Sequence, residues 1–229
     1  DPDAVADALE RLEQRHHEGG RAHYYRVRDE QFNPTRAAER HADGRIAYTP
    51  ELAAMLIYLN RTGFNGLFRV NASGAFNVPA GRYAKPRIAD RSRLHEAAVA
   101  LSAPGVRLQW GSFDGAGAIA RRGDFLYFDP PYAPLSPTSA FTSYTTPRVG
   151  AAEQRALQQQ VIDLAGRGCH VLLSNSTAPE IRDLYDTNDA ARAAGLRAWR
   201  VPARRAINSN AARRGAVDEY LITTLPRRD

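Results

Sequence analysis

The feature that most constrains the fold is an apolar run, Phe125–Phe128, that leads directly into the tetrapeptide Asp129-Pro130-Pro131-Tyr132. A nearly continuous apolar run is typical of a strand buried in a parallel sheet. Segments of strand and helix character alternate around it. We expect strands at residues 106–110, 170–174, 196–201 and 220–225, and helices at residues 151–166 and 178–185. This alternation predicts an α/β sheet.

The tetrapeptide has the chemistry needed to bind an exocyclic amine. Ligands of open α/β sheets bind beyond the carboxyl ends of the strands. The Asp129 carboxylate and the Pro130 carbonyl can accept the two N–H groups of an adenine amine, and the prolines stiffen the turn. The Tyr132 ring offers a face on which a base can stack. These residues favour an amino-methyltransferase; the alternative is an ordinary turn at a strand end.

The first hundred residues are predicted to be mainly helical. Three of the four expected helices are residues 3–15, ended by Gly19-Gly20, a short one carrying Tyr24, Tyr25, Arg28 and Phe32, and one that begins at Pro50 with Thr49 as its cap. The fourth is capped by Asp90 and runs to about Leu101, with Leu94, Ala98 and Leu101 inward. Glycines interrupt residues 61–89, which predicts a β-hairpin or loop module.

The positive charge is concentrated in parts of the chain. The formal net charge is +6, and residues 191–229 contain nine arginines and three acids. Residues 52–89, 130–152 and 190–217 contain no acid at all. Such surfaces favour phosphate through counterion release. An arginine-rich proteome with chance gaps is the alternative.

Residues 61–87 combine cations with planar side chains. The cations are Arg61, Arg69, Arg82, Lys85 and Arg87, and the aromatic residues are Phe64, Phe68, Phe76 and Tyr83. Cations suit phosphates, and planar groups suit bases. The segment therefore predicts a DNA-reading module. A basic surface hairpin is the alternative, and in either case we expect Phe68 and Phe76 to form its small core.

Taken together, the motifs of this chain resemble the Dam family of adenine-N6-specific DNA methyltransferases, whose catalytic motif is Asp-Pro-Pro-Tyr. The resemblance covers nearly the whole chain. Besides residues 129–144 it includes Tyr25, Arg28, Phe32 and Asn33, residues 58–69, residues 76–83, Leu173-Ser174-Asn175, and Arg205-Ala206-Ile207-Asn208-Ser209-Asn210.

The resemblance implies S-adenosylmethionine-dependent methylation of adenine N6 in duplex DNA, at GATC, with the target base flipped out of the helix. It implies catalytic roles for Asp129, Pro130, Pro131 and Tyr132. It places an aromatic wedge at Phe64 beside Asn65, and base contacts at Leu67, Arg69 and Pro79. Further DNA contacts are expected from Arg82 and from a basic tail loop with Arg205, Asn208, Asn210 and Arg214; the loop is a phosphate clamp or a solvated hairpin.

The cofactor site is expected to be incomplete. Family members carry a Gly-rich loop and a ribose-binding acid before the recognition module, and this chain begins after both. The pattern Phe113-Asp114-Gly115-Ala116-Gly117 is similar to such a loop, but only seven residues separate Gly117 from Phe125, too few for a crossover. The resemblance implies that Asp129 and Phe113 bind the cofactor, with Phe113 lining the adenosine pocket. We therefore expect a Rossmann-like methyltransferase sheet without its N-terminal strands.

The expected division is a helical and hairpin target-recognition region, 1–101, with the DNA-reading module at about 58–89, and a catalytic region, 102–229. A catalytically inactive DNA-binding remnant is the main alternative. A methyltransferase for ribosomal RNA or for protein glutamine is a weaker one, because residues 61–87 argue against it. The single cysteine, Cys169, excludes a disulfide framework. The histidines show no metal spacing, and no membrane-length apolar run or signal is present, so a cytoplasmic protein without a metal is expected.

Overall fold

The computed structural model describes residues 1–135, 150–204 and 216–226. The chain divides into two compact units, Asp1–Trp110 and Gly111–Asp229. The functional division expected near residue 101 stays a prediction. Within the described ranges, no helix has the length and apolar character needed to cross a membrane.

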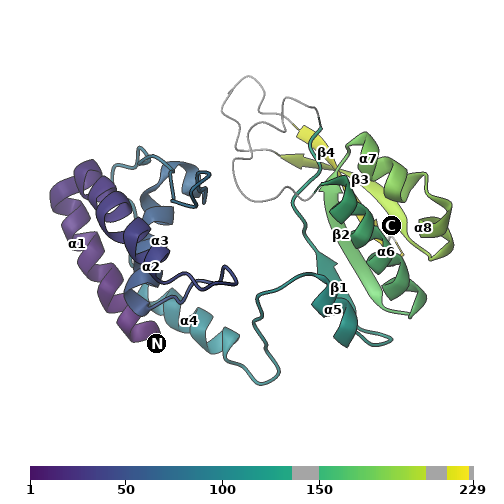
Figure 1. Ribbon diagram of the computed structural model, residues 1–229, viewed down its shortest axis with the longest axis horizontal. Coiled ribbons are helices and arrows are strands. Elements are labelled where there is room, and N and C mark those ends of the chain that lie inside the picture. The colour runs from purple at the N-terminus through teal and green to yellow at the C-terminus, as the bar shows by residue number, and fades with distance from the viewer. Residues whose placement is uncertain (136–149, 205–215, 227–229) are drawn as a thin grey trace. The chain divides into compact units, whose positions relative to one another are not determined.

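The first unit is helical (Figure 1). Its helical elements are α1 (Pro2–Arg26), the π-helical stretch η1 (Val27–Phe32), α2 (Asn33–Ala38), α3 (Pro50–Thr62), the single 3-10 turn η2 (Phe64–Gly66) and α4 (Arg91–Leu101). Gly20 has a φ of 48° and interrupts the helical backbone, but α1 resumes at once. The two helices expected on either side of Gly19-Gly20 are therefore one bent element. Tyr24, Phe32 and Tyr58 are fully buried in the core.

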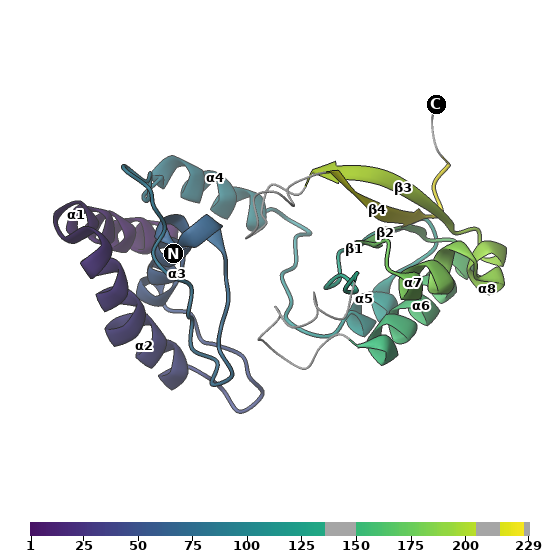
Figure 2. The ribbon, with the colours of Figure 1, turned by 90° about the horizontal axis from the view of Figure 1, so that it is seen from above.

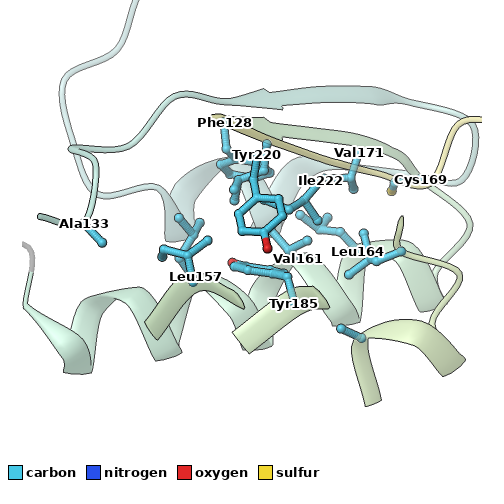
Figure 3. Close-up of a cluster of buried hydrophobic side chains, with 14 of the residues drawn as sticks. Phe128, Ala133, Leu157, Val161, Leu164, Cys169, Val171, Tyr185, Tyr220 and Ile222 are labelled. Atoms are coloured by element: carbon cyan, nitrogen blue, oxygen red, sulfur yellow. The ribbon is translucent and has the colours of Figure 1, made fainter. Parts of the chain in front are cut away.

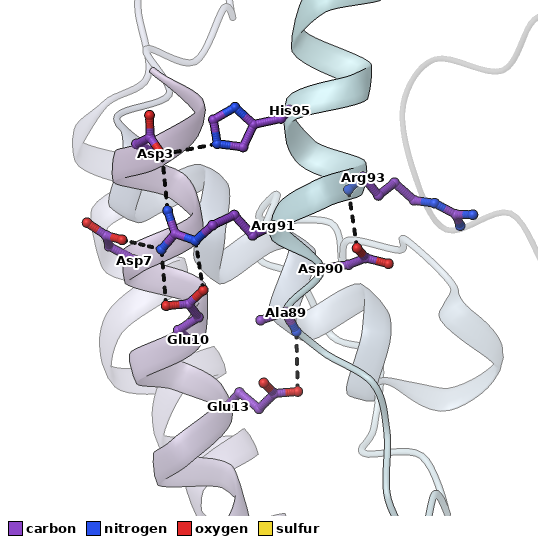
Figure 4. Close-up of polar contacts among 9 residues, drawn as sticks. All are labelled: Asp3, Asp7, Glu10, Glu13, Ala89, Asp90, Arg91, Arg93 and His95. Atoms are coloured by element: carbon purple, nitrogen blue, oxygen red, sulfur yellow. Dashed lines mark hydrogen bonds and ion pairs between the residues drawn. The ribbon is translucent and has the colours of Figure 1, made fainter.

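Helices α3 and α4 begin at the caps that the sequence predicts. The Thr49 hydroxyl accepts a hydrogen bond from the Leu52 amide at 3.2 Å, and the Asp90 carboxylate accepts one from the Arg93 amide at 3.2 Å. Helix α4 packs on α1 through an exposed ionic cluster in which Arg91 contacts three carboxylates, those of Asp3, Asp7 and Glu10 (Figure 4). The expectation that Leu101 points inward is wrong: it is 51% exposed.

Residues 61–89 follow a hairpin path, but their contacts are isolated antiparallel bridges, Gly63↔Ala80 and Val70↔Phe76, rather than a regular ladder. Side chains of the preceding helices take the place of strand partners. The Asn33 side chain donates to the Phe76 carbonyl at 3.0 Å and accepts from the Phe76 amide at 2.8 Å. Phe76 is buried as expected, whereas Phe68 is 52% exposed, so its assignment to the core is wrong.

The second unit is a four-stranded mixed sheet with helices. Its elements are α5 (Asp114–Ile119), β1 (Phe125–Phe128), α6 (Ala151–Gly166), β2 (His170–Ser176), α7 (Pro179–Ile181), the π-helical stretch η4 (Arg182–Asp186), α8 (Asp189–Ala193), β3 (Arg197–Arg204) and β4 (Ala216–Thr223). The strand order is β1-β2-β4-β3. Strand β1 is parallel to β2, and β4 is antiparallel to both of its neighbours. Helices α6, α7 and α8 lie on one face (Figure 2).

The core of this unit lies between those helices and the sheet (Figure 3). Phe128, Val171 and Tyr220 of the strands pack with Leu157 and Val161 of α6. Side chains alternate along a strand, so Phe125 and Tyr127 point to the opposite face, whereas Leu126 packs against the core with Phe128.

Phe125 is 57% and Tyr127 is 56% exposed on that opposite face. The parallel pairing expected for β1 is confirmed, but its burial on both faces is wrong. The strand expected at residues 106–110 is also wrong, since the backbone there is irregular and Leu108 and Trp110 are exposed. The other strands and helices expected in this half are present, with ends shifted by a few residues.

Candidate active site and recognition segment

Asp129 directly follows β1, and a serine of the neighbouring strand orients its carboxylate. The Ser174 Oγ donates a hydrogen bond of 2.8 Å to the Asp129 Oδ1 and lies 3.3 Å from the Tyr127 hydroxyl. Ser174 is buried, whereas Asp129 is exposed. The carboxylate is therefore fixed in direction and still open to a ligand.

The turn after Asp129 is held by buried polar side chains. The Gln154 Nε2 donates to the Pro131 carbonyl at 3.1 Å. The Ala133 amide donates to the Asn175 Oδ1 at 3.0 Å, and the Ser176 Oγ donates to the Ala133 carbonyl at 2.6 Å. Residues on either side of Tyr132 are thus tied to α6 and β2.

These clamping side chains are joined to each other. The Asn175 Nδ2 donates to the Gln154 Oε1 at 3.2 Å, and the Asn175 Oδ1 also accepts from the Ser176 amide at 2.8 Å. Asn175 is 0% exposed. Since a buried polar group left without a partner costs about 1–3 kcal/mol, the arrangement specifies one conformation of the turn. Among the residues that the structure describes, none donates a hydrogen bond to the Pro130 carbonyl, which stays available as an acceptor.

Tyr132 is half-buried, and its hydroxyl lies 3.4 Å from the Glu219 Oε2 of β4, to which it donates. Burial raises the pKa of Tyr132; the Ser174 hydroxyl opposes this shift, and the Glu219 and Asp129 carboxylates add to it. The phenol therefore stays neutral at physiological pH, with its ring anchored by the hydroxyl.

In the first unit, the predicted wedge lies at the turn after α3. The Phe64 amide donates to the Pro79 carbonyl at 2.9 Å, which brings two predicted DNA-contacting residues together. Asn65 has a φ of 53°, in the left-handed region. Phe64, Leu67 and Pro79 are exposed, as a surface that meets bases requires.

Arg69, the predicted guanine reader, is exposed and oriented by Asn77. The Arg69 Nε donates to the Asn77 Oδ1 at 2.7 Å, while the Nη2 lies 3.4 Å from the Asn77 carbonyl. No other residue in the described part of the chain bonds the Arg69 guanidinium. Arg82 is exposed in the same segment. The predicted residues Arg205, Asn208, Asn210 and Arg214 lie outside the described residues.

The glycine pattern at residues 113–117 forms packed structure rather than an open loop. Helix α5 begins at Asp114, and the Phe113 carbonyl accepts a hydrogen bond of 3.0 Å from the Gln160 Nε2. A Cβ placed on Gly117 would lie 2.1 Å from the same nitrogen. Phe113 packs against the core of this unit. Residues 113–117 therefore do not form an open Gly-rich loop, and the assignment of Phe113 and Asp129 to the cofactor site stays a prediction.

Sequence reasoning gave no role to the residues that hold the active-site turn. Ser174 and Asn175 stood out only as part of a motif after a buried strand, and Gln154 and Glu219 were not singled out. A signal existed for Gln154, because it lies one helical turn before Leu157 on the buried side of α6, where a polar residue needs a partner. In the part of the chain described here, no cluster of histidine, cysteine and acidic side chains could hold a metal ion.

Comparisons with known proteins agree on one family. The sequence profile of the D12 class of N6 adenine-specific DNA methyltransferases matches residues 1–199. The chain is 38% identical over 183 residues to the type II methyltransferase M1.LlaDCHI of Lactococcus lactis subsp. cremoris, covering 79% of this chain and 62% of that protein. It is 39% identical over 153 residues to the type II methyltransferase M.MjaIII of Methanocaldococcus jannaschii, covering 67% and 49%.

The DNA adenine methylase of Escherichia coli strain K12 is 36% identical over 203 residues, covering 89% of this chain and 65% of that protein. The chain thus spans about half to two thirds of the length of these relatives. The profile match includes both the predicted DNA-reading module at about 58–89 and the turn after Asp129. The chain belongs to the D12 class of N6 adenine-specific DNA methyltransferases.

Proposed function

We propose that the protein containing this chain methylates the N6 amine of adenine in duplex DNA, with S-adenosylmethionine as the methyl donor and the target base rotated out of the helix. The observation that carries the proposal is the exposed Asp129 carboxylate, oriented by Ser174 at the end of β1 and followed by the open Pro130 carbonyl. Family membership implies a Rossmann-like sheet, and we propose that the four described strands are part of it.

The two acceptors match the two hydrogens of the adenine amine. In this arrangement one N–H donates to the Asp129 carboxylate and the other to the Pro130 carbonyl. This pairing orients the nitrogen lone pair toward the incoming methyl group, so catalysis rests on positioning and electrostatics. When bound, the cofactor supplies a methyl group on a positively charged sulfur. After methyl transfer the nitrogen carries one proton too many. The Asp129 carboxylate, already hydrogen-bonded to this amine, can accept that proton.

Tyr132 is assigned to stacking against the flipped base. Two contacts fix the position of this ring. Gln154 holds the preceding residue through the Pro131 carbonyl, and the Tyr132 hydroxyl donates to Glu219. Because the phenol stays neutral, the ring presents an uncharged face to the base.

The proposed target sequence is GATC. The exposed edge of the Arg69 guanidinium can bind guanine O6 and N7 together, and the apolar Leu67 and Pro79 can meet thymine methyl groups. Phe64, exposed at its turn, is assigned as the wedge that fills the gap left by the flipped base. Contacts from Arg82 and from the tail residues Arg205, Asn208, Asn210 and Arg214 would go mainly to phosphates.

Radiolabelled methyl transfer by the full-length protein tests this function. Parallel reactions contain a GATC duplex, the same duplex already methylated at adenine N6, a ribosomal RNA fragment and a protein substrate. The expected result is transfer to the unmethylated duplex alone, with the label recovered in N6-methyladenine. Tight duplex binding without transfer would instead support the catalytically inactive DNA-binding remnant. Transfer to RNA or protein would contradict the proposal.

A further inference from the structure

The first unit has a cavity of about 370 Å³ that the proposed active site and base contacts do not use. It lies where the bend of α1, the end of α3 and residues 80–86 meet. The lining side chains that matter here are His16, His17, Arg21, Thr62, Tyr83 and Lys85. The volume is large enough for a phosphate group with part of its sugar.

The lining is positively charged and has no carboxylate to balance it. Arg21 and Lys85 are cations, and no aspartate or glutamate lines the cavity. Neither of these two side chains forms an ion pair with a carboxylate anywhere in the described ranges. Arg28, Arg45 and Arg91 of the same unit are paired with acids. The cavity therefore carries unbalanced positive charge, which a bound anion would neutralise.

Two of the lining groups are held in place by tyrosines. The Arg21 Nη2 donates to the Tyr25 hydroxyl at 3.3 Å, and the guanidinium lies 5.6 Å from the centre of the Tyr25 ring. The His16 Nδ1 lies 2.8 Å from the Tyr58 hydroxyl. Burial raises the pKa of Tyr58, so this hydroxyl stays protonated. Burial and the neighbouring His17 lower the pKa of His16.

Backbone hydrogen bonds connect the lining of the cavity to the turn that carries Phe64. The Gly81 amide donates to the Thr62 carbonyl at 2.8 Å, and both residues line the cavity. The next backbone hydrogen bond along this segment joins the Phe64 amide to the Pro79 carbonyl. An anion bound in the cavity is therefore held at a fixed position relative to the wedge.

We propose that this cavity is a phosphate-binding pocket that takes one backbone phosphate of the DNA duplex, outside the recognised bases. The choice of DNA as the source of the phosphate rests on the proposed function; the affinity for the phosphate group itself does not. Such a contact fixes the register of the protein on the duplex without reading sequence.

The first test compares two double variants of the full-length protein. R21Q/K85Q removes two cations from the pocket, and R15Q/R93Q removes two exposed arginines of the same unit that do not line it. His16 is left intact because it contacts the buried Tyr58. We expect R21Q/K85Q to weaken duplex binding on the order of tenfold at low salt and to make the log–log salt dependence shallower by about one, because one phosphate contact is lost. If the two double variants change duplex affinity and its salt dependence equally, the proposed phosphate pocket is contradicted.

The second test locates the phosphate. Duplexes that each carry one uncharged methylphosphonate linkage are titrated with the unaltered protein, R21Q/K85Q and R15Q/R93Q. The unaltered protein should lose affinity at one or two adjacent linkages outside GATC, and that loss should disappear in R21Q/K85Q but persist in R15Q/R93Q. A scan that is identical in all three proteins contradicts the assignment. If the unaltered protein does not bind duplex DNA at all, the proposed function fails instead.

A third arm separates the two sources of phosphate. Inorganic phosphate is titrated against the protein by calorimetry at constant ionic strength, with sulfate and chloride as controls. Weak binding that R21Q/K85Q removes and DNA competes away is expected. Tight phosphate binding that duplex DNA does not displace would mean that the pocket serves a free phosphate compound, and the assignment to DNA would be wrong.

Discussion

The Ser174 hydroxyl donates a hydrogen bond of 2.8 Å to the Asp129 carboxylate, across the boundary between two parallel strands. The adjacent residue, Asn175, points to the other face of the sheet, where it holds the turn after Asp129. Strand alternation thus lets two consecutive residues of β2 support the same site from opposite sides. One orients the carboxylate, and the other fixes the turn behind the Pro130 carbonyl.

Replacement of Asp129 by alanine should nearly abolish methyl transfer by the full-length protein. The amine would lose its charged acceptor, whereas phosphate contacts, which dominate affinity, would remain. Single-turnover rates and duplex dissociation constants, measured at one salt concentration, check both halves of the expectation. Substantial residual turnover in D129A would remove Asp129 from the proposed role.

Replacement of Asn175 by alanine should lower kcat more than it changes KM for DNA. The substitution leaves the Ala133 amide and the Gln154 Oε1 without these partners, at a cost of about 1–3 kcal/mol of stability, and loosens the turn.

Asn188→Ala is the matched control, because Asn188 caps α8 through a 3.0 Å bond to the Ala191 amide, and loss of a cap costs about 1 kcal/mol. Thermal melts should show both variants destabilised, with kcat reduced in N175A alone. Equal kcat values at a temperature where both are folded would make Asn175 a purely structural residue.

Arg69 and Arg61 should behave differently. Loss of a bidentate guanine contact costs about 1–3 kcal/mol and relaxes specificity at one base pair, whereas loss of a phosphate contact weakens all sequences alike. We expect R69A to methylate near-cognate variants of GATC relatively better than the unaltered protein does, and R61A to slow all sites by one factor.

Competition between GATC and single-substitution duplexes in one reaction measures this ratio directly. N77A is informative as well, because it removes the side chain that orients Arg69 without removing the guanidinium. An R69A variant that lowers cognate and near-cognate rates equally would make Arg69 an electrostatic anchor only.

Gly117→Ala should reduce stability without reducing the affinity for S-adenosylmethionine. The added Cβ would displace the Gln160 side chain from its bond to the Phe113 carbonyl, and a hydrogen bond of this kind contributes about 1 kcal/mol. Calorimetric titration of the full-length protein and a denaturant melt give the two values. A large loss of cofactor affinity in G117A would identify residues 113–117 as part of the cofactor site.

Sequence patterns predicted the features that depend on neighbouring residues. The caps at Thr49 and Asp90 are local signals, since each side chain bonds an amide three residues later, and both helices begin where expected. The parallel pairing of Phe125–Phe128 and the turn that follows it were predicted for the same reason. The apolar strand, Asp129 and the two prolines are adjacent in the sequence.

Features that depend on distant partners were missed. The apolar residues of β1 do not reveal which face of the sheet a helix covers, so the exposure of Phe125 and Tyr127 was not foreseen. Asn175 and Gln154 are 21 residues apart and meet only once β2 and α6 have packed. The hairpin expected at residues 61–89 has few strand bonds of its own because Asn33, 43 residues before Phe76, supplies the partner groups.

Strand β4 is the last of the four in chain order, yet it lies between β2 and β3 in the sheet. On a ribosome, β3 has therefore emerged before the strand that joins it to β2 has been made. Ser174 and Asn175 pair with Leu221 and Tyr220, so the β2 edge beneath the active site stays open until those two residues have been synthesised. An open edge is a template for wrong pairing, so the nascent chain is exposed to misassembly during this interval. A stop codon before Ala216 would remove the middle of the sheet, not its end.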